Sequence, residues 1–312
     1  IEAIETVLDD TIPNGKSPDL KAIRRRVDRR GDGRKELQEL RSLLAGWDYV
    51  TPRTRTPSGE DVERSGAALL FNTMMVYLIR DTFGDEFKKI RSYWSGYFAV
   101  PFDSQLFPRV LIWMLEKPKE ALTWDKQVGD TLVFDDMQTD KRIETRTFQL
   151  VRALLKAKDR LASGQKLATV FDREIPSPNS PKPDDWVWGK VHGLKLDGLL
   201  PFGQETYRRP AKGLPFFPRG GGEFAVSPCD HGYDDFNFTC SSGASLRMVH
   251  DMDPEGPTTY NAIPGGYSMD PEDASYMSEF DRWQAPDPRK IETDPAKLEE
   301  SGAERVVYGS GR

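Results

Sequence analysis

Residues 65–83 read SGAALLFNTMMVYLIRDTF, and this stretch decides the first half of the fold. Its centre is apolar on nearly every side of a helix, which indicates a helix buried in the core rather than one on the surface. It is too short and too interrupted by polar residues to span a bilayer. Further segments carry apolar residues at helical spacing, and we expect helices at 20–27, 36–44, 87–97, 107–115 and 144–163.

The composition and the hydrophobic pattern of the sequence change after Ser163. Four prolines between residues 176 and 183 mark a loop, and short alternating segments separated by Gly and Pro turns follow it. We expect strands at 222–226, 245–252, 259–263 and 305–308. A helical first half followed by a strand-rich second half predicts an α+β fold.

This pattern predicts a mainly helical region at 1–163 and a loop- and strand-rich region at 164–312. The late strands are few and short for a self-sufficient sheet. We therefore expect one domain that is incomplete without upstream sequence. The sequence opens at Ile1 with no initiator Met and no signal-peptide pattern, which is typical of a mature piece or a fragment.

Composition excludes two classes of function. The 312 residues carry 44 Lys and Arg against 50 Asp and Glu, a net charge of −6, and the basic residues are scattered. This balance argues against nucleic-acid binding. The mean hydropathy is −0.62, and no apolar run is long enough to predict a membrane-spanning helix.

Cys229 and Cys240 are the two cysteines and stand eleven residues apart. Two interpretations stay open. A disulfide would close a short loop and indicate an oxidising compartment, and the alternative is a pair of free thiols. A zinc site needs more ligands than His231 adds to this pair, so no metal site is expected here.

Other local motifs have structural explanations. A phosphate loop at Gly220–Gly222 would need a helix after it and a GK[ST] signature. A strand-like segment follows instead, which favours a tight turn. Residues 251–256 begin like a calcium loop, but the twelfth position is Ala262 where a bidentate Glu is required, which favours a hairpin turn. Asn237 starts a glycosylation sequon of a kind that is common by chance.

The sequence contains no complete catalytic constellation. No GxSxG elbow occurs, and the histidines have no Ser or Cys neighbour in a recognisable nucleophile setting. We expect each of them to be a hydrogen-bonded structural residue. They are His192, His231 and His250.

Three sequence blocks, taken in their order along the chain, nevertheless resemble a known protein family. They are WVWGKVH at 186–192, FPRGGGEFAV at 217–226, and a segment at 243–283 that contains GASLRMVHDM and IPGGYSMDP. This ordered set resembles the C-terminal part of the β chain in the penicillin acylase (penicillin amidase) family. Upstream, LLAGWDY at 43–49 is similar to a family helix that ends in a Trp-Asp pair. Tyr267, Met269 and Tyr276-Met277 depart from the residues usual there, which marks a divergent member.

The resemblance implies an αββα N-terminal-nucleophile hydrolase sandwich, which the late strands would complete. The implied activity is hydrolysis of linear amide C–N bonds in small N-acyl compounds. In this chemistry the first residue of a processed chain supplies the nucleophile and its α-amine the base, and backbone N–H groups with an Asn stabilise the oxyanion. The family's nucleophile and oxyanion residues lie upstream of the blocks matched here, so the chain alone is expected to be inactive.

The resemblance also implies partners and one site residue. The partners are the upstream part of the β chain and the α chain of the same precursor, in a periplasmic or secreted protein. No cofactor is expected in this chain, while calcium is expected in the full-length protein. Asp251 aligns with a carboxylate that assists the catalytic centre in some members. His250 would face the opposite side of the same strand.

The alternative from another class is a stand-alone, non-catalytic binding or assembly module of the same fold. Such a module would be soluble and cooperative alone, whereas a fragment would expose unpaired strand edges and aggregate. An unrelated enzyme that uses His250 and Asp251 would need a nucleophile that the sequence does not offer.

Overall fold

The computed structural model describes residues 1–85, 106–137, 139, 142–170, 173–194, 216–222, 225–226, 228–233, 235–240, 242–268, 270, 273–285, 287–304 and 306. The chain divides into two compact units. The first comprises Ile1–Leu194 with Leu214–Ser242, and the second comprises Lys195–Gly213 with Gly243–Arg312.

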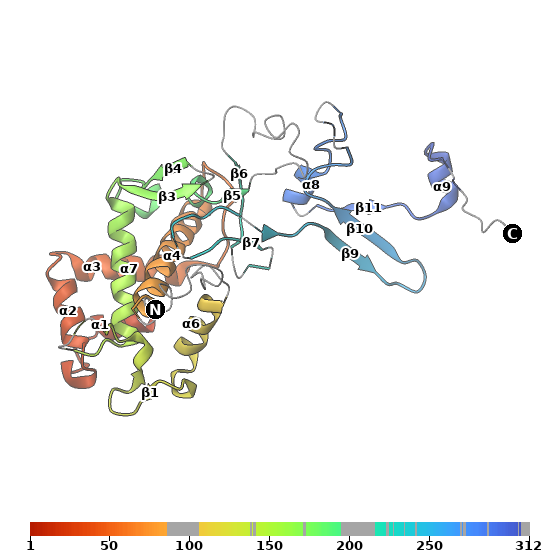
Figure 1. Ribbon diagram of the computed structural model, residues 1–312. Coiled ribbons are helices and arrows are strands. Elements are labelled where there is room, and N and C mark those ends of the chain that lie inside the picture. The colour runs from red at the N-terminus through yellow and green to blue at the C-terminus, as the bar shows by residue number, and fades with distance from the viewer. Residues whose placement is uncertain are drawn as a thin grey trace, which may run out of the picture. The chain divides into compact units, whose positions relative to one another are not determined.

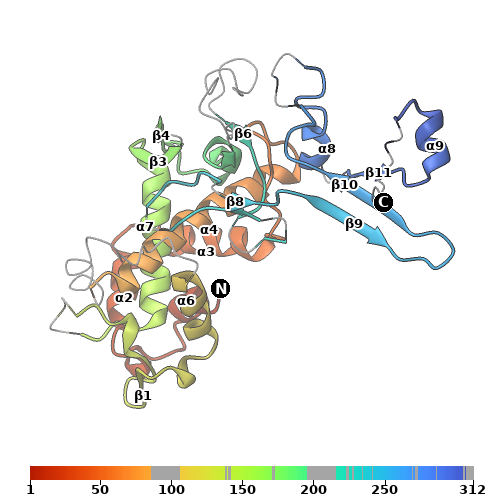
Figure 2. The ribbon, with the colours of Figure 1, turned by 45° about the vertical axis from the view of Figure 1, so that its right-hand side comes forward.

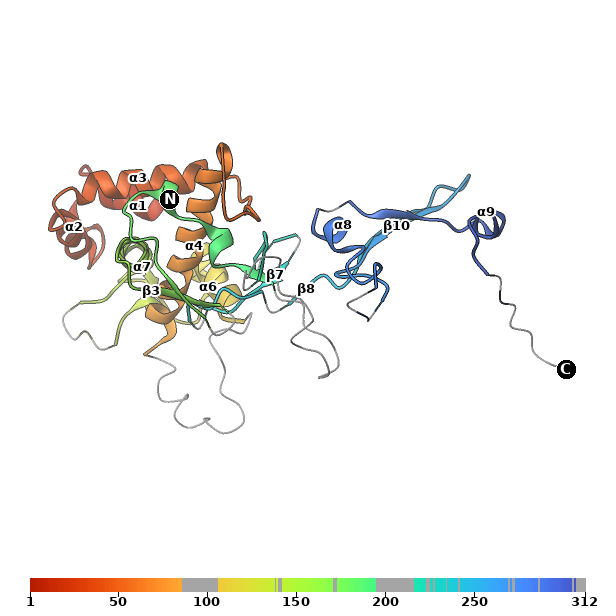
Figure 3. The same ribbon diagram turned by 90° about the horizontal axis from the view of Figure 1, so that it is seen from above.

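The first unit is built around helices. They are α1 (Glu2–Leu8), α2 (Leu20–Asp28), α3 (Gly33–Gly46), α4 (Glu60–Phe83), α6 (Leu106–Glu116) and α7 (Arg146–Ala162). Helices α4 and α7 lie side by side at its centre (Figure 1). Helix α1 packs on α7 and beside α3, as the view from above shows (Figure 3). The predicted helices at 20–27, 36–44, 65–83, 107–115 and 144–163 are confirmed with small shifts at their ends, whereas 87–97 lies outside the described residues.

Helix α4 is the buried helix that its composition predicts. It begins at Glu60, five residues before the apolar stretch, with Glu60, Asp61 and Glu63 in its first turn. These carboxylates interact favourably with the positive end of the helix dipole. Side chains from all around the helix are buried, including Leu70, Val76 and the polar Asn72. Such all-round burial requires neighbours on every side, and α3, α6 and α7 contribute them.

Helix α7 is positioned by carboxylates at its first turn. The backbone N–H of Thr145 donates to Oδ2 of Asp19 at 2.6 Å, and that of Arg146 donates to Oδ2 of Asp130 at 2.9 Å. Both acids are almost fully buried, and burial raises the pKa of Asp130. The two hydrogen bonds satisfy amides that a helix start leaves without intrahelical partners.

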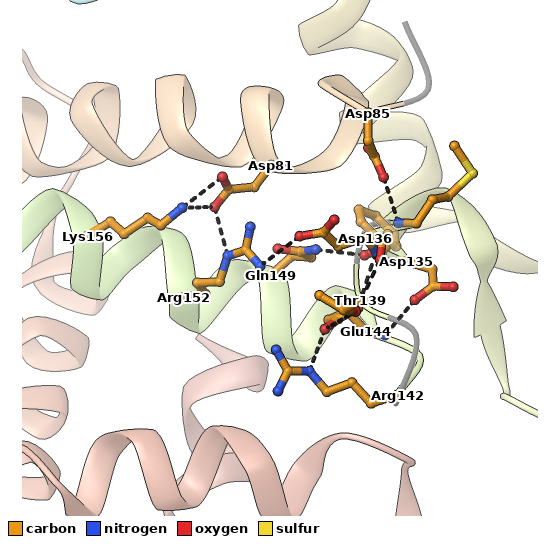
Figure 4. A network of polar contacts seen from close by, with 12 residues as sticks. Asp81, Asp85, Asp135, Asp136, Thr139, Arg142, Glu144, Gln149, Arg152 and Lys156 are labelled. Carbon is orange, nitrogen blue, oxygen red and sulfur yellow. Dashed lines mark hydrogen bonds and ion pairs between the residues drawn. The ribbon is translucent and has the colours of Figure 1, made fainter. Parts of the chain in front are cut away.

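A polar network joins α7 to α4 and to the segment before α7 (Figure 4). Asp81 of α4 accepts from Nε of Arg152 at 3.0 Å and from Nζ of Lys156 at 2.7 Å. Glu144, with a fully buried side chain, accepts from the hydroxyl of Thr139 and from Arg142. The network fixes the rotation of α7 against α4, since two residues one helical turn apart on α7 bind the same carboxylate.

The first unit also contains two-stranded antiparallel sheets. They pair β1 (Trp124–Asp125) with β2 (Asp130–Thr131), β3 (Lys166–Val170) with β4 (Arg173–Pro176), and β5 (Gly193–Leu194) with β6 (Phe217–Pro218). Strands β7 (Cys229–Asp230) and β8 (Ser242–Gly243) form a further two-stranded sheet, where the first unit ends at Ser242. Single 3₁₀ turns occupy Asn14–Lys16, Pro118–Glu120, Leu132–Phe134, Pro183–Asp185 and Trp188–Lys190.

The predicted strand at 222–226 is not a strand at its described positions, 222 and 225–226. Gly221, just before it, has a φ of 92°, a left-handed conformation that favours glycine.

The second unit carries a three-stranded antiparallel sheet in the order β11–β10–β9 (Figure 2). Strands β9 (Arg247–Asp251) and β10 (Thr258–Ala262) confirm the predicted strands at 245–252 and 259–263. Strand β11 (Arg289–Ile291) and helices α8 (Phe280–Gln284) and α9 (Pro295–Glu300) are additional. The predicted strand at 305–308 lies outside the described residues except for Val306. The structure is therefore a mixture of helices and small antiparallel sheets, as an α+β fold requires.

Candidate functional site

The block at 186–192 is anchored on the first turns of α4. The backbone N–H of Trp188 donates to Oγ of Ser65 at 2.8 Å, and the indole N–H of Trp186 donates to the carbonyl of Ser180 at 2.9 Å. Gly189 lies against the chain before α4, because a Cβ there would stand 2.2 Å from the carbonyl oxygen of Thr54. Only glycine fits this position, so the block packs closer than a larger residue would permit.

His192 lies inside an aromatic cluster formed by this block. Its ring stacks on Trp188, with centroids 4.6 Å apart and an angle of 16° between the planes. Its Nδ1–H donates to the carbonyl of Phe238 at 2.8 Å. Burial lowers the pKa of His192 well below its usual value, and nearby His231 and Arg219 lower it further. His192 is therefore neutral at physiological pH.

His231 meets the same cluster from the neighbouring loop. Its ring lies edge-on to those of His192, at 5.4 Å, and Tyr233, at 4.9 Å. Burial lowers the pKa of His231 to about 4. Its Nδ1 lies 3.2 Å from the carbonyl of Gly232, and a carbonyl only accepts, so Nδ1 carries the proton. The Nε2 atoms of both histidines are buried acceptors without a partner among the described residues.

A disulfide closes the loop that contributes half of this cluster. Cys229 and Cys240 are bonded, with Cα atoms 5.0 Å apart. Between them, Tyr233 donates its hydroxyl to Oδ1 of Asn72 at 2.9 Å, which ties the loop to the middle of α4. Asn72 in turn donates to the carbonyl of Ala68 at 2.8 Å. The loop is therefore held covalently at its base and by a buried hydrogen bond at its tip.

The chemistry of the cluster is that of a neutral, buried site. In the part of the chain that the structure describes, neither His192 nor His231 is hydrogen-bonded to a Ser, Thr or Cys side chain. The pairing of base and nucleophile that acyl transfer needs is absent from these two rings. What the cluster offers is hydrogen-bond acceptors in an apolar setting.

Asp251 lies in the second unit, at the exposed end of β9. Its Oδ1 accepts from the backbone N–H of Asp253 at 3.2 Å, which forms the start of the predicted turn. His250 faces the other side of the strand, and its Nδ1 lies 2.9 Å from the hydroxyl of Thr259. The described ranges contain no group of three or more His, Cys, Asp or Glu side chains placed to hold a metal ion.

Asn72 and Tyr233 are the site residues that the sequence analysis misses. Asn72 stands in an apolar helix, and a polar residue there is a signal that its side chain needs a buried partner. The identity of that partner has no local signal, because Tyr233 lies 161 residues away.

The fold and the cluster define an α+β protein with a disulfide-closed aromatic site. A family model described as penicillin amidase matches residues 4–300, nearly the whole chain. The chain therefore belongs to the penicillin amidase family, which confirms the resemblance carried by the three blocks. This membership indicates an amidohydrolase-like function. No curated protein matches the chain. Among the described residues, none of the helices has the length and apolar character needed to cross a membrane.

Proposed function

We propose that residues 1–312 form the C-terminal portion of the β chain of an amidohydrolase that cleaves linear amide bonds in small N-acyl compounds. The observation that carries the proposal is the family match over residues 4–300. The N-terminal nucleophile and the oxyanion donors belong to upstream sequence. This assignment fits the absence of a nucleophile bonded to the buried imidazoles in the described structure.

Strand β9 supports the need for partner chains. Its Met248 and Val249 point to opposite faces of the sheet, and each is more than half exposed, at 54% and 55%. Apolar side chains exposed on both faces of an edge strand are a liability unless another chain covers them. The proposed partners are the upstream part of the β chain and the α chain of the same precursor. With them, β9–β11 would complete the αββα sandwich.

Asp251 is proposed to act as an auxiliary acid at the catalytic centre of the complete enzyme. Its carboxylate is exposed in this chain and free of ion pairs among the described residues. Asp251→Asn in the full-length enzyme should lower kcat about tenfold or more with little change in KM. Asp253→Asn, on the same turn, is the matched control and should leave both constants unchanged. Equal behaviour of the two variants would remove Asp251 from the mechanism.

Calcium in the full-length protein and a periplasmic or secreted location complete the proposal. The Cys229–Cys240 disulfide supports an oxidising compartment. Calcium would be held by residues upstream of this chain.

The test compares purified residues 1–312 with the natural protein from its source. A chromogenic acyl-anilide should be hydrolysed by the natural protein and left intact by residues 1–312. Intact mass and N-terminal sequencing of the natural protein should show a longer chain that begins with Ser, Cys or Thr, together with a second chain. Hydrolysis by residues 1–312 alone would overturn the proposal. A natural chain that begins at Ile1 with no partner would leave the stand-alone, non-catalytic module as the function.

A further inference from the structure

A cavity of about 290 Å³ lies in the first unit between the turn after α1 and helix α2. Its walls are rich in charge, unlike the mostly apolar walls of typical small-molecule sites. Four of the lining side chains are cationic and two are carboxylates. The cations are Lys21, Arg24, Arg25 and Arg34, and the carboxylates are Asp10 and Asp28. The cavity is therefore suited to a small ligand that carries negative charge.

Arg34 of α3 binds both carboxylates of the cavity wall. Its Nε donates to Oδ1 of Asp28 at 2.8 Å, and its Nη1 donates to Oδ2 of Asp10 at 3.1 Å. These hydrogen bonds raise the pKa of Arg34 above its usual value. Since the two carboxylates share this one cation, the other three lining cations leave the cavity with an excess of two positive charges.

Arg24 is the buried charge in this wall, with a side chain only 7% exposed. Each of its five N–H groups donates to an oxygen that carries no formal charge. The acceptors are the backbone carbonyls of Thr6, Val7, Asp9 and Ile12 and Oδ1 of Asn14. The carboxylate of Asp9 accepts from Thr11 instead. These hydrogen bonds fix the guanidinium but do not neutralise it, and a buried charge is stabilised most by an opposite charge nearby.

Lys21 and Arg25 stand one helical turn apart on α2, and both side chains are exposed. Residues at this spacing lie on the same face of a helix, where two like charges destabilise it. In the part of the chain that the structure describes, neither side chain has a carboxylate partner. Their N–H donors are therefore available to a ligand in the cavity, and an anion bound there would relieve the repulsion between them.

We propose that this cavity binds a phosphate dianion, either the free ion or the phosphate group of a monoester. Lys21 and Arg25 would donate to its oxygens, and the planar fork of Arg25 suits two of them at once. The charge of Arg24 would attract the ligand from within the wall. A monocarboxylate such as acetate carries half the charge and is expected to bind more weakly. The inference concerns binding alone and is independent of the proposed function.

The test titrates residues 1–312 with inorganic phosphate, phenyl phosphate and acetate at equal ionic strength and mildly alkaline pH, where phosphate is mainly the dianion. Isothermal titration calorimetry should detect phosphate with a Kd of about 1 mM or lower, and acetate should bind at least about tenfold more weakly. Binding of inorganic phosphate alone identifies the free ion as the ligand, whereas binding of phenyl phosphate identifies the phosphate group of a monoester. Because the whole chain carries a net charge of −6, general attraction of anions does not account for such binding.

Lys21→Gln and Arg25→Gln test the site separately. Each removes a positive charge and its donors, and each should weaken phosphate binding at least about fivefold. Lys166→Gln is the matched control, because it removes the same charge from an exposed ion pair with Glu174, and it should bind phosphate as the unsubstituted chain does. Circular dichroism checks that each variant is folded.

Four results would each overturn the proposal. They are no binding of either phosphate by the folded chain, acetate binding as tight as that of phosphate, an unchanged affinity in either folded variant, and an equal loss of affinity in Lys166→Gln.

Discussion

His231 makes the first unit sensitive to acid, and His231→Gln measures that sensitivity. The imidazole is buried and its pKa is lowered to about 4, whereas in an unfolded chain it is about 6.5. Between pH 6.5 and 4 the unfolded chain therefore binds a proton at His231, whereas the folded chain keeps this imidazole neutral. Stability falls as the pH falls from 6.5 towards 4, and the loss is complete below the lower value.

The magnitude follows from the two pKa values. One pKa unit corresponds to about 1.4 kcal/mol, so the full loss is about 3 kcal/mol. About 1 kcal/mol of it has appeared at pH 5.5 and roughly 2 to 3 kcal/mol at pH 4.5. His231→Gln keeps a neutral polar side chain and removes the titrating group. As the pH is lowered from 7.5, the free energy of unfolding of His231→Gln should therefore rise relative to that of the unsubstituted chain by these amounts.

Urea unfolding followed by far-ultraviolet circular dichroism at pH 7.5, 6.5, 5.5 and 4.5 provides the assay. Taking the difference at each pH cancels the carboxylates, which titrate in both proteins. Loss of His231 removes one cause of the lowered pKa of His192, and this change favours the variant in the same direction. His250→Gln is the matched control, because its side chain is exposed on β9, and it should follow the unsubstituted chain at every pH. If the curve for His231→Gln also runs parallel to that of the unsubstituted chain, His231 is not buried in its neutral form and the reasoning fails.

Three further predictions concern stability. Cys240→Ser, or reduction of the disulfide, should cost about 3 kcal/mol of unfolding free energy, the chain-entropy value for so short a loop, as measured by urea unfolding with and without reductant. Asp81→Asn should lower the free energy of unfolding by about 2 kcal/mol, because it removes charged hydrogen bonds to α7. Lys35→Ala, in an exposed ion pair, should lower it by less than about 0.5 kcal/mol. Equal losses would show that the network around Asp81 does not stabilise the packing of α7 on α4. In thermal unfolding, Gly189→Ala should lower the free energy of unfolding by roughly 2 to 3 kcal/mol through overpacking. The control Gly46→Ala, whose Cβ meets no atom within 4 Å, should not lower it.

The long helices were predictable because their signal is local. In α4 and α7 the apolar residues recur along a single segment, so the residues that determine each helix are the residues that form it. Short elements lack this redundancy. Helix α9 carries the start signal Asp294-Pro295, and Asp294 accepts from the backbone N–H of Ala296, yet six residues show too little periodicity to be found.

The candidate site was predictable only in part. The Trp188–His192 stack arises within one block, and the block was recognised from sequence. Its meeting with His231 depends on how a separate loop folds back, which no spacing encodes. The same holds for Asn72 and Tyr233, whose hydrogen bond joins the middle of a helix to a distant loop. These polar groups form the candidate site because the tertiary fold brings them together, and residue type alone does not predict that contact.

The position of α4 in the chain has a consequence for biosynthesis. Its chief packing partner, α7, begins at Arg146, 63 residues after α4 ends at Phe83. At about 5–20 residues per second of translation, the end of α4 leaves the ribosome about 3 to 13 seconds before α7 begins to emerge. During that interval α3 is already present, but a helix that is apolar on almost every side lacks α7, its chief neighbour. We expect this helix to be the segment of the nascent chain on which chaperones act.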